Sequence, residues 1–273
     1  MNKELKTIIV KALKEDIPTI DVSSHYLFQD EISEGKFIAK EAGVISGIDI
    51  CEEVFATIDP DTKFTIHKNN GDVVKIGDII AECKGKTKSI LMSERVGLNF
   101  LQRMSGIASL TKKFVDETKG FDTVILDTRK TTPLLRMLEK RAVVDGGATN
   151  HRMNLSEMVM LKDNHIKAAK SLTDAVNKVR QNVGKNMKIE VEVEDLDKFK
   201  EALASSADII MLDNMSNSLM SECVLLNKKQ KVLEASGNMT VDRIKLVCQT
   251  GVDTISVGGL THSYTSLDIS LKF

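Results

Sequence analysis

The sequence predicts an α/β protein in which a strand-and-turn region precedes a barrel of parallel strands and helices. Three observations support this prediction. From Lys36 to about Lys88, short apolar segments alternate with glycine-containing turns. From Ser93, apolar residues recur at helical spacing over a long stretch. After Gly120, apolar runs alternate with amphipathic stretches of helical length, which is typical of a parallel sheet with helical crossovers.

The composition is that of an ordinary globular protein. The chain has 273 residues, of which 42% are hydrophobic and 28% are charged, so it can bury a substantial core. The net charge of −1 indicates no global attraction to nucleic acid or to an anionic membrane. No apolar run reaches the roughly 18 residues of a membrane span. Residues 1–18 indicate a short amphipathic helix and not a signal peptide.

The four cysteines are widely spaced and form no CxxC pair. This spacing argues against a zinc ribbon and against thioredoxin-like redox chemistry. We therefore expect a cytoplasmic protein with reduced thiols.

The first hundred residues predict strands followed by one long helix. The segment "GKFIAKEAGVISGID" alternates, and "NNGDVVKIGDIIAECKG" predicts two short strands separated by tight turns. The second segment also looks like half of a biotinyl or lipoyl carrier domain. Such carriers display a lysine in a Met-Lys-Met setting, and none lies upstream, so we favour a turn pattern within the domain. For the long helix, Ser93 is the expected N-cap and Gly120 the expected stop.

Six apolar runs follow Gly120. They are "TVIL" (123–126), "MVML" (158–161), "IEVEV" (189–193), "DIIML" (208–212), "KVLEA" (231–235) and "TISV" (254–257). A seventh strand is expected if "ATNHRM" contributes one, which is close to an α/β barrel. An open doubly wound sheet is the alternative, but no GxGxxG motif follows the first run.

Each run ends in charged residues or glycine, and in a barrel these ends meet on one face. The first is followed by Asp127, Thr128, Arg129 and Lys130, and the second by Lys162, Asp163, Asn164 and His165. The others carry Glu190, Glu192, Glu194, Asp213, Asn214, Ser236, Gly237, Asn238, Gly258 and Gly259. We therefore expect the functional site at this face.

The cations of this set indicate an anionic substrate. Arg129, Lys130, Arg152 and Lys162 lie at or beside strand ends, and His151 is a fifth candidate. The planar fork of arginine suits a carboxylate or a phosphate. The strand-end glycines let backbone N–H groups approach a phosphate closely.

Two carboxylates, Glu192 and Asp213, stand among these cations. Such carboxylates are suited to hold a divalent metal or sugar hydroxyl groups, and magnesium typically takes one or two carboxylates plus substrate phosphates. The residues alone therefore predict a substrate with several anionic groups, at least one of them a phosphate.

Seven ordered motifs then match one known family. They are "DTRKTTP", "GGATNHR", "LKDNH", "EVEVE", "IMLDN", "LEASGN" and "ISVGGLTHS". With "EDIPTIDVSS" near the N-terminus, they resemble the quinolinate phosphoribosyltransferase family, also called nicotinate-nucleotide pyrophosphorylase (carboxylating). The resemblance implies a mixed α/β N-terminal domain over residues 1–103, joined by the tail at about 264–273. It also implies a seven-stranded α/β barrel over residues 104–263.

The family reaction condenses quinolinate with phosphoribosyl pyrophosphate. It gives nicotinate mononucleotide, pyrophosphate and carbon dioxide, a step of de novo NAD biosynthesis. The resemblance therefore implies a magnesium-dependent glycosyltransferase of the pentosyltransferase class.

The resemblance also implies roles for individual residues. Arg129, Arg152 and Lys162 would contact quinolinate, with His151 beside them, and Lys130 would face the pyrophosphate. The catalytic set implied is Lys130, Lys162, Glu192 and Asp213, in which the two carboxylates serve the ribose hydroxyls and magnesium, directly or through water. The remaining substrate-binding residues implied are Thr128, Ser236, Gly237, Asn238, Gly258 and Gly259, the last five around the 5′-phosphate.

Arg95, in "SERVGLNF", matches an arginine that the family inserts from the neighbouring subunit. The resemblance therefore implies a homodimer with shared active sites, or a hexamer built from three such dimers.

Three positions depart from the family pattern. Leu134 replaces a frequent glycine, and Arg141 and Ala148 stand where an aromatic residue and a third glycine are usual. We expect these changes near the core, away from the contact residues.

Two alternative activities remain. Relatives of the same fold act on nicotinate or are associated with molybdenum uptake, but the cations exceed what one carboxylate requires. A Schiff-base aldolase would use Lys130 or Lys162 as its nucleophile.

Overall fold

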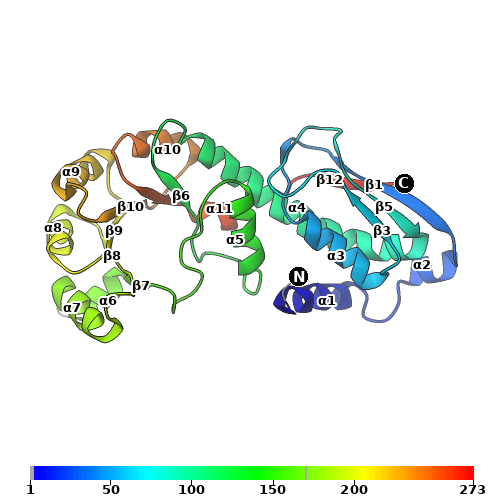
Figure 1. Cartoon of the computed structure of the whole chain (residues 1–273), viewed down its shortest axis with the longest axis horizontal. Helices are drawn as coiled ribbons and strands as arrows, with labels where there is room; N and C mark the ends of the chain where they lie inside the picture. The colour runs from blue at the N-terminus through cyan, green and yellow to red at the C-terminus, as the bar shows by residue number, and fades with distance from the viewer. Residues whose placement is uncertain (1–2, 170) are drawn as a thin grey trace. The chain divides into compact units, whose positions relative to one another are not determined.

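The computed structural model describes residues 3–169 and 171–273, which fall into two compact units (Figure 1). The first unit contains the chain up to Leu110 together with Val144–Gly147 and Tyr264–Phe273. The second contains Thr111–Val143 and Ala148–Ser263. The C-terminal tail therefore belongs to the same unit as the first hundred residues.

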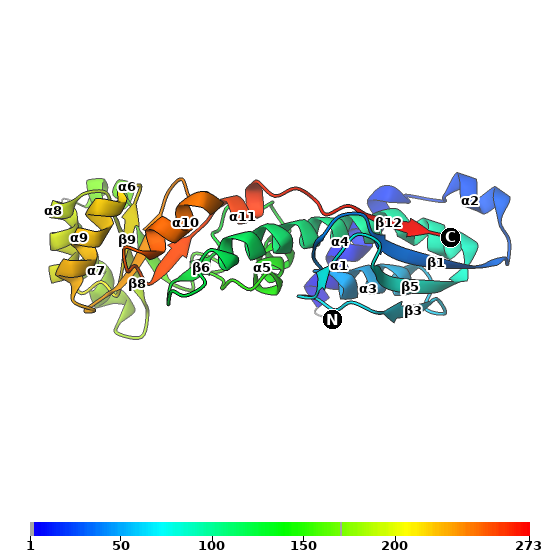
Figure 2. The same cartoon turned by 90° about the horizontal axis from the view of Figure 1, so that it is seen from above.

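The N-terminal unit is built on an antiparallel sheet with strand order β12-β1-β5-β3. These strands are β1 (Ile32–Ala39), β3 (Lys63–Ile66), β5 (Ile79–Lys86) and β12 (Ile269–Lys272), and a separate pair is formed by β2 (Gly43–Val44) and β4 (Val73–Val74). The helices are α1 (Lys3–Asp16), α2 (Val22–Leu27), α3 (Ile48–Ile58) and α4 (Thr87–Asp116). Figure 2 shows β12, the last strand of the chain, beside β1.

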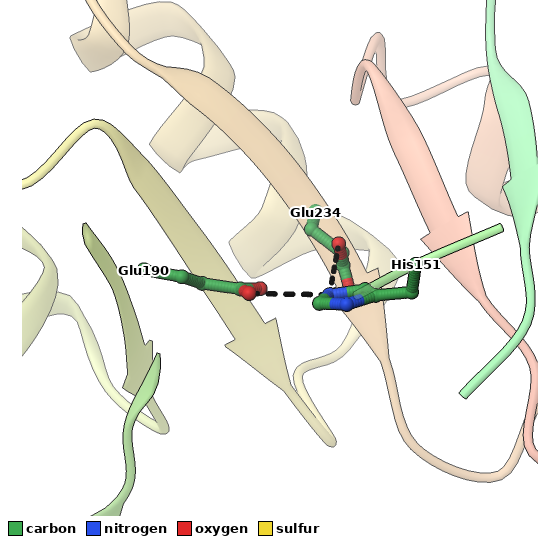
Figure 3. A group of neighbouring side chains, drawn as sticks. All are labelled: His151, Glu190 and Glu234. Carbon is green, nitrogen blue, oxygen red and sulfur yellow. Dashed lines mark ion pairs between the residues drawn. The ribbon is translucent and has the colours of Figure 1, made fainter. Parts of the chain in front are cut away.

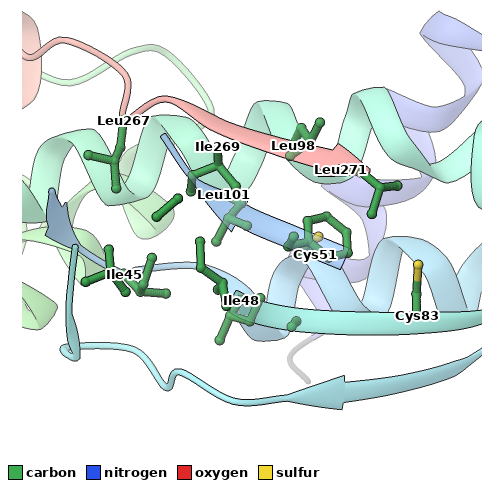
Figure 4. Packing of buried hydrophobic residues seen from close by; sticks show 14 of the residues in the cluster. Ile45, Ile48, Cys51, Cys83, Leu98, Leu101, Leu267, Ile269 and Leu271 are labelled. Atoms are coloured by element: carbon green, nitrogen blue, oxygen red, sulfur yellow. The ribbon is translucent and has the colours of Figure 1, made fainter. Parts of the chain in front are cut away.

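The core of this unit joins residues from both ends of the chain (Figure 4). Leu267, Ile269 and Leu271 of the tail are buried in the same cluster as Ile48 of α3 and Leu101 of α4. Three phenylalanines add aromatic contacts, with ring centroids 5.4 to 5.7 Å apart. Because the tail contributes large apolar side chains, it is an integral part of this core.

Two sequence predictions for this region need correction. The long helix begins at Thr87, not after Ser93, and the Ser93 hydroxyl donates to the carbonyl of Ser89 within the helix. The backbone N–H of Thr87 donates to the carbonyl of Glu31, which anchors the first turn of α4. α3 lies where only strands and turns were predicted. Gly47 was read as a turn residue between strands, but it is the N-cap of this helix.

The C-terminal unit contains a parallel sheet with strand order β6-β11-β10-β9-β8-β7. The strands are β6 (Val124–Leu126), β7 (Val159–Leu161), β8 (Ile189–Val193), β9 (Ile209–Asp213), β10 (Val232–Ser236) and β11 (Thr254–Ser256). The helices are α5 (Arg136–Asp145), α6 (Asp163–Ala168), α7 (Leu172–Val183), α8 (Leu196–Ala204), α9 (Asn217–Asn227), α10 (Val241–Cys248) and α11 (Gly259–His262). All six predicted apolar runs are strands, which confirms the α/β assignment.

A seventh segment lies beside β6, since Leu126 forms an isolated parallel bridge with Thr149. Thr149 belongs to "ATNHRM", the segment considered for the seventh strand, but it forms one bridge and not a full strand. The sheet is curved, and Figure 1 shows β10, β9, β8 and β7 following an arc, with α7, α8, α9 and α10 outside it. Its strands carry buried residues on both faces, as a helix-covered parallel sheet requires.

No helix in the described part of the chain is both long and apolar enough to cross a membrane.

Candidate active site

The predicted site residues of the C-terminal unit lie at the carboxyl ends of its parallel strands. Thr128, Arg129 and Lys130 follow β6, and Lys162 follows β7. Further along the sheet, the end positions are held by Glu192, Asp213, Ser236, Gly237, Asn238, Gly258 and Gly259. The register pairs Asp213 directly with Ser236. The sheet therefore brings residues from six strands to one edge.

Arg95 is the exception among the predicted residues. It is exposed and lies in α4, in the part of the helix that belongs to the N-terminal unit. Its predicted contact with a neighbouring subunit stays a prediction.

Arg129 and Arg152 are two strand-end cations whose charges repel each other. Burial lowers the pKa of Arg152, and the charge of Arg129 lowers it further, while Glu190 opposes both effects. The Nη1 group of Arg152 donates to the carbonyl of Met158 at 2.7 Å, and the buried Nε of Arg129 has no hydrogen-bond partner within residues 3–169 and 171–273. An anion placed between the two guanidinium groups would relieve their repulsion and satisfy the free donor.

Lys162 forms an ion pair with Glu192, in which Nζ lies 2.8 Å from Oε2. The lysine side chain is 48% exposed, whereas that of Glu192 is 11% exposed. A half-exposed pair of this kind contributes little stability, so a substrate can separate its partners at low cost.

Lys130 is held by the segment that follows β11. The carbonyl of Lys130 accepts a hydrogen bond of 2.7 Å from the hydroxyl of Thr261. A side chain at Gly258 would place its Cβ 2.9 Å from Cδ of Lys130. Gly258 therefore leaves room for the lysine stem, whereas a Cβ at Gly259 would lie 4.0 Å from Cγ1 of Val257, an ordinary contact that tolerates a small side chain.

The loop after β10 needs glycine at one position. Gly237 has φ +93°, and a Cβ there would lie 2.1 Å from Oδ1 of Asn214. Arg243 of α10 donates to the carbonyl of Gly237 at 2.9 Å and to that of Met215 at 3.0 Å. Arg243, which the sequence analysis did not single out, therefore ties the loop after β9 to the loop after β10.

A buried ion pair between Asp127 and Lys140 supports the loop that carries His151 and Arg152. Nζ of Lys140 donates to the carbonyl of His151, and the N–H of His151 donates to Asp127, each at 2.8 Å. Burial raises the pKa of Asp127 and lowers that of Lys140, while their mutual pairing opposes both shifts. Removing one partner of such a pair leaves an uncompensated charge, so the pair holds the loop firmly.

α5 supplies this lysine and two further supports. Arg136 donates from Nε to the hydroxyl of Thr131 at 3.0 Å, and Glu139 accepts from the N–H of Thr132 at 3.0 Å. The positions 136, 139 and 140 share one face of a helix. That polar stripe is a signal in the sequence that could have identified α5 as the support of the "TTP" loop.

His151 lies in a buried cluster with Glu190 of β8 and Glu234 of β10 (Figure 3). Its Nε2 is 3.1 Å from Oε2 of Glu190 and 3.5 Å from Oε2 of Glu234. Burial lowers the pKa of His151, but the two carboxylates outweigh this effect and raise the pKa to about 10. Burial also raises the pKa of Glu190.

The ring orientation decides where the hydrogens of this cluster lie. The backbone N–H of Arg152 donates to Nδ1 of His151 at 2.7 Å, so Nδ1 is an acceptor. The ring hydrogen therefore lies on Nε2, between the carboxylates. The raised pKa of His151 alone would put a second hydrogen on Nδ1, but that hydrogen would face the N–H of Arg152. We follow the hydrogen-bond geometry and assign a further proton of the cluster to a carboxyl group, which agrees with the raised pKa of Glu190. Glu190 was named among the residues at the strand ends but was given no role, and Glu234 was not a predicted site residue.

The departures from the family pattern do not share one environment. Leu134 was expected near the core, but it is 85% exposed and has φ +68°, a conformation that favours glycine. Ala148 is buried, and Arg141 is half-buried in α5.

This fold and these strand-end groups define an α/β enzyme that binds substrates with several anionic groups. Two family models match the chain: the N-terminal domain of quinolinate phosphoribosyl transferase over residues 21–105, and its C-terminal domain over residues 107–272. The chain belongs to the quinolinate phosphoribosyltransferase family.

Individual relatives agree with this assignment. A probable nicotinate-nucleotide pyrophosphorylase (carboxylating) of Bacillus subtilis is 41% identical over 268 residues, covering 98% of this chain and 93% of the relative. A quinolinate phosphoribosyltransferase (decarboxylating) of Nicotiana tabacum is 44% identical over 289 residues, covering 98% and 82%. The solved nicotinate-nucleotide pyrophosphorylase from Francisella tularensis has a TM-score of 0.96 at 36% identity, with 100% and 96% covered.

Proposed function

We propose that this chain transfers the phosphoribosyl group of phosphoribosyl pyrophosphate to quinolinate, with loss of carbon dioxide, to give nicotinate mononucleotide and pyrophosphate. Relatives that carry the name of this enzyme match 98% of the chain. The observation in the structure that supports it best is the pair Arg129 and Arg152. Two neighbouring guanidinium groups at strand ends, one with a free buried donor, suit a substrate with two adjacent carboxylates.

Quinolinate would bind on the side of Arg129, Arg152 and Lys162. Lys162 would exchange its partner Glu192 for a substrate carboxylate, which frees Glu192 for the ribose side. In the structure both ring nitrogens of His151 face protein groups, so its predicted contact with quinolinate stays a prediction.

The sugar donor would bind on the side of Lys130 and the later strands. Lys130 would stabilise the departing pyrophosphate, and the loops after β10 and β11 would bind the 5′-phosphate. Asn238, with φ +48°, follows Gly237 in the first of these loops, so the backbone there takes the turn that presents N–H groups to an anion.

Magnesium is the cofactor that we propose for this site. Glu192 and Asp213 are incompletely buried carboxylates on adjacent strands, and Asp213 accepts from the amide of Asn214 at 2.8 Å. This donor set fits magnesium, which takes one or two carboxylates together with substrate phosphates. When bound, the metal would neutralise charge on the pyrophosphate.

Loss of pyrophosphate builds positive charge on the ribose carbon. The carboxylates of Glu192 and Asp213 would stabilise that charge. The ring nitrogen of quinolinate is a weak nucleophile, so its placement by the arginines contributes much of the rate. After glycosylation the ring is a cationic electron sink, and the adjacent carboxylate leaves as carbon dioxide without a protein nucleophile.

We also propose a homodimer, or a hexamer of three dimers, in which Arg95 completes the site of a neighbouring chain. A cytoplasmic location is proposed on the cysteines, all four of which are buried and free.

Product analysis tests the reaction. The purified chain is incubated with phosphoribosyl pyrophosphate and magnesium, with quinolinate in one reaction and nicotinate in a parallel one. We expect nicotinate mononucleotide and carbon dioxide from quinolinate, with little turnover of nicotinate, and no product after magnesium is chelated. Equal or faster turnover of nicotinate would overturn the substrate assignment.

A further inference from the structure

The cluster of His151, Glu190 and Glu234 is unusual because it buries two carboxylates beneath a binding site for anions. The two glutamate side chains are 0% and 2% exposed. Within residues 3–169 and 171–273, neither carboxylate oxygen of Glu190 has a hydrogen-bond partner, and Oε1 of Glu234 has none, although both side chains form ion pairs with Nε2 of His151. Buried carboxylates with free oxygens cost stability, so packing alone does not explain them.

The two carboxylates meet at one atom. Figure 3 shows both side chains pointing at the same edge of the His151 ring, from strands that are not adjacent in the sheet. That edge is Nε2, and the ring hydrogen lies there because Nδ1 accepts the backbone N–H of Arg152. The carboxylates at Nε2 and the backbone N–H at Nδ1 therefore favour the same neutral tautomer of the ring.

The tautomer of His151 determines whether the ring can accept the backbone N–H of Arg152, the next residue in the chain. With Nδ1 as acceptor, the backbone of Arg152 is fixed at 2.7 Å from the ring. The backbone groups of His151 are fixed at the same time by Asp127 and Lys140. Three consecutive polar backbone groups thus depend on side chains inside the unit, and the guanidinium of Arg152 projects from this fixed point.

We propose that Glu190 and Glu234 are positioning residues that hold His151 with its hydrogen on Nε2 and thereby place Arg152 for quinolinate. The inference rests on the proposed function for its substrate. Neither glutamate touches the substrate in this scheme, since both act through the ring. A displaced guanidinium would lose the two parallel hydrogen bonds that it makes to a carboxylate, because the fork tolerates little error in angle.

A metal ion is the competing occupant of the cluster, since the three ligand atoms lie within 4.8 Å of one another. Coordination by His151 would use the lone pair of Nε2. In the structure Nδ1 already accepts a hydrogen bond, so Nε2 carries the hydrogen and offers no lone pair. The geometry therefore favours the positioning role.

The test uses apolar substitutions, which separate stability from function. Glu190→Met and Glu234→Met each remove one of two carboxylates that face the same ring, so His151 keeps one charged partner and the chain should still fold. We expect quinolinate to bind at least tenfold more weakly in calorimetric titration, with the affinity for phosphoribosyl pyrophosphate changed less than twofold. Glu190→Gln and Glu234→Gln retain an acceptor oxygen and should lose less affinity than the methionine variants.

A matched control is available in the N-terminal sheet. His67 and Glu82 form a similar pair, with Nε2 3.2 Å from Oε2, but outside the site. Glu82→Met should leave quinolinate binding unchanged. Affinity within twofold of the wild type in folded Glu190→Met and Glu234→Met would overturn the proposal.

Nitrogen-15 NMR of the His151 ring reports which ring nitrogen carries the hydrogen. If the two glutamates only stabilised the fold, their substitution would not change this position. In the wild-type chain we expect the hydrogen on Nε2, and in the methionine variants a shift toward the Nδ1 tautomer. A wild-type ring with its hydrogen on Nδ1 would overturn the proposal even if no variant folded, and it would favour the metal. Failure of the wild type to bind or convert quinolinate would instead overturn the proposed function, and the ring tautomer would still report on the cluster.

Discussion

At the scale of single residues, the proposed site would depend on the shape of its side chains as much as on their charge. Arg129 carries a buried Nε without a partner in the described residues, and Arg136 donates to its carbonyl at 3.4 Å. The backbone of Arg129 is thus held from α5 while its guanidinium stays available. This arrangement makes Arg129 the best single position at which to test the proposed chemistry.

Arg129→Ala should lower kcat/KM for quinolinate by at least a hundredfold, which corresponds to about 2.7 kcal/mol of barrier. Arg129→Lys should also be poor, because an ammonium group cannot form two parallel hydrogen bonds to a carboxylate. Steady-state kinetics of both variants would measure this, with the surface variant Lys200→Ala as a control that keeps normal rates. Near-normal kinetics in either Arg129 variant would exclude the proposed contact.

Leu134 allows a prediction about stability. Its φ of +68° is costly for any residue with a Cβ, and its side chain is 85% exposed and packs little. Leu134→Gly should therefore raise the free energy of unfolding by roughly 0.5 to 1 kcal/mol. Urea denaturation would measure the change.

The matched control is Leu225→Gly, since Leu225 is 76% exposed but lies in the helix α9. That substitution should lower the free energy of unfolding by about 1 kcal/mol. A lower free energy of unfolding in Leu134→Gly would mean that the contacts of the leucine side chain stabilise the fold by more than its positive φ costs.

At the scale of elements, all six parallel strands were predictable because each is a short apolar run bounded by polar residues. β8 was predicted with the bounds that the structure has. α3 was missed, and α4 begins six residues before the predicted cap, because caps and turn glycines are local signals that tertiary contacts override.

The candidate site shows the same division. Residues that follow strands could be found, because the barrel interpretation brings strand ends together. Glu190 could have been predicted to lie on the same face of the sheet as Glu192, since the two residues are two positions apart in one strand. The pairing of Asp127 with Lys140, and of His151 with Glu234, could not be predicted, because each joins segments whose contact exists only in the folded chain.

One tie between elements makes a prediction about pH. Arg180 of α7 pairs with Asp208 at 2.6 Å, and the N–H of Ile189 donates to the same carboxylate at 2.8 Å. Burial raises the pKa of Asp208, but these two contacts outweigh it and hold the pKa below its ordinary value. The contribution to stability is therefore fully present above the ordinary aspartate pKa of about 4 and is lost as the pH falls through the lower pKa of the folded chain.

Asp208→Asn should lower the free energy of unfolding at pH 7 by about 1 to 3 kcal/mol. The difference from the wild type should shrink as the pH falls below about 4, because the wild type then loses the same interaction. Denaturation curves at pH 7, 5, 4 and 3 would show this, with the exposed Asp122→Asn as the control. A difference that stays constant down to pH 3 would show that the charge of Asp208 contributes nothing.

At the scale of the whole molecule, the predicted contact residues are divided between two units. Arg95 lies in α4 within the N-terminal unit, and the other predicted contacts lie in the C-terminal unit. α4 has 30 residues, so it is about 45 Å long at 1.5 Å per residue. A rigid helix of this length can present an exposed arginine at a fixed place on the surface of the chain, where a second copy could receive it.

Mixing two inactive variants tests whether Arg95 completes the site of a neighbour. In a mixed dimer of Arg95→Ala and Arg129→Ala chains, one site inherits both defects and the other inherits neither. Random exchange at equal amounts makes half of the dimers mixed, so we expect about a quarter of the wild-type activity to return, as the two-fold symmetry of a shared site requires. Subunit exchange would be verified by mass tagging. If Arg95 acts within its own chain, each site of a mixed dimer lacks either Arg95 or Arg129, so both sites stay inactive. Verified exchange without any return of activity would therefore show that Arg95 acts within its own chain or has only a packing role.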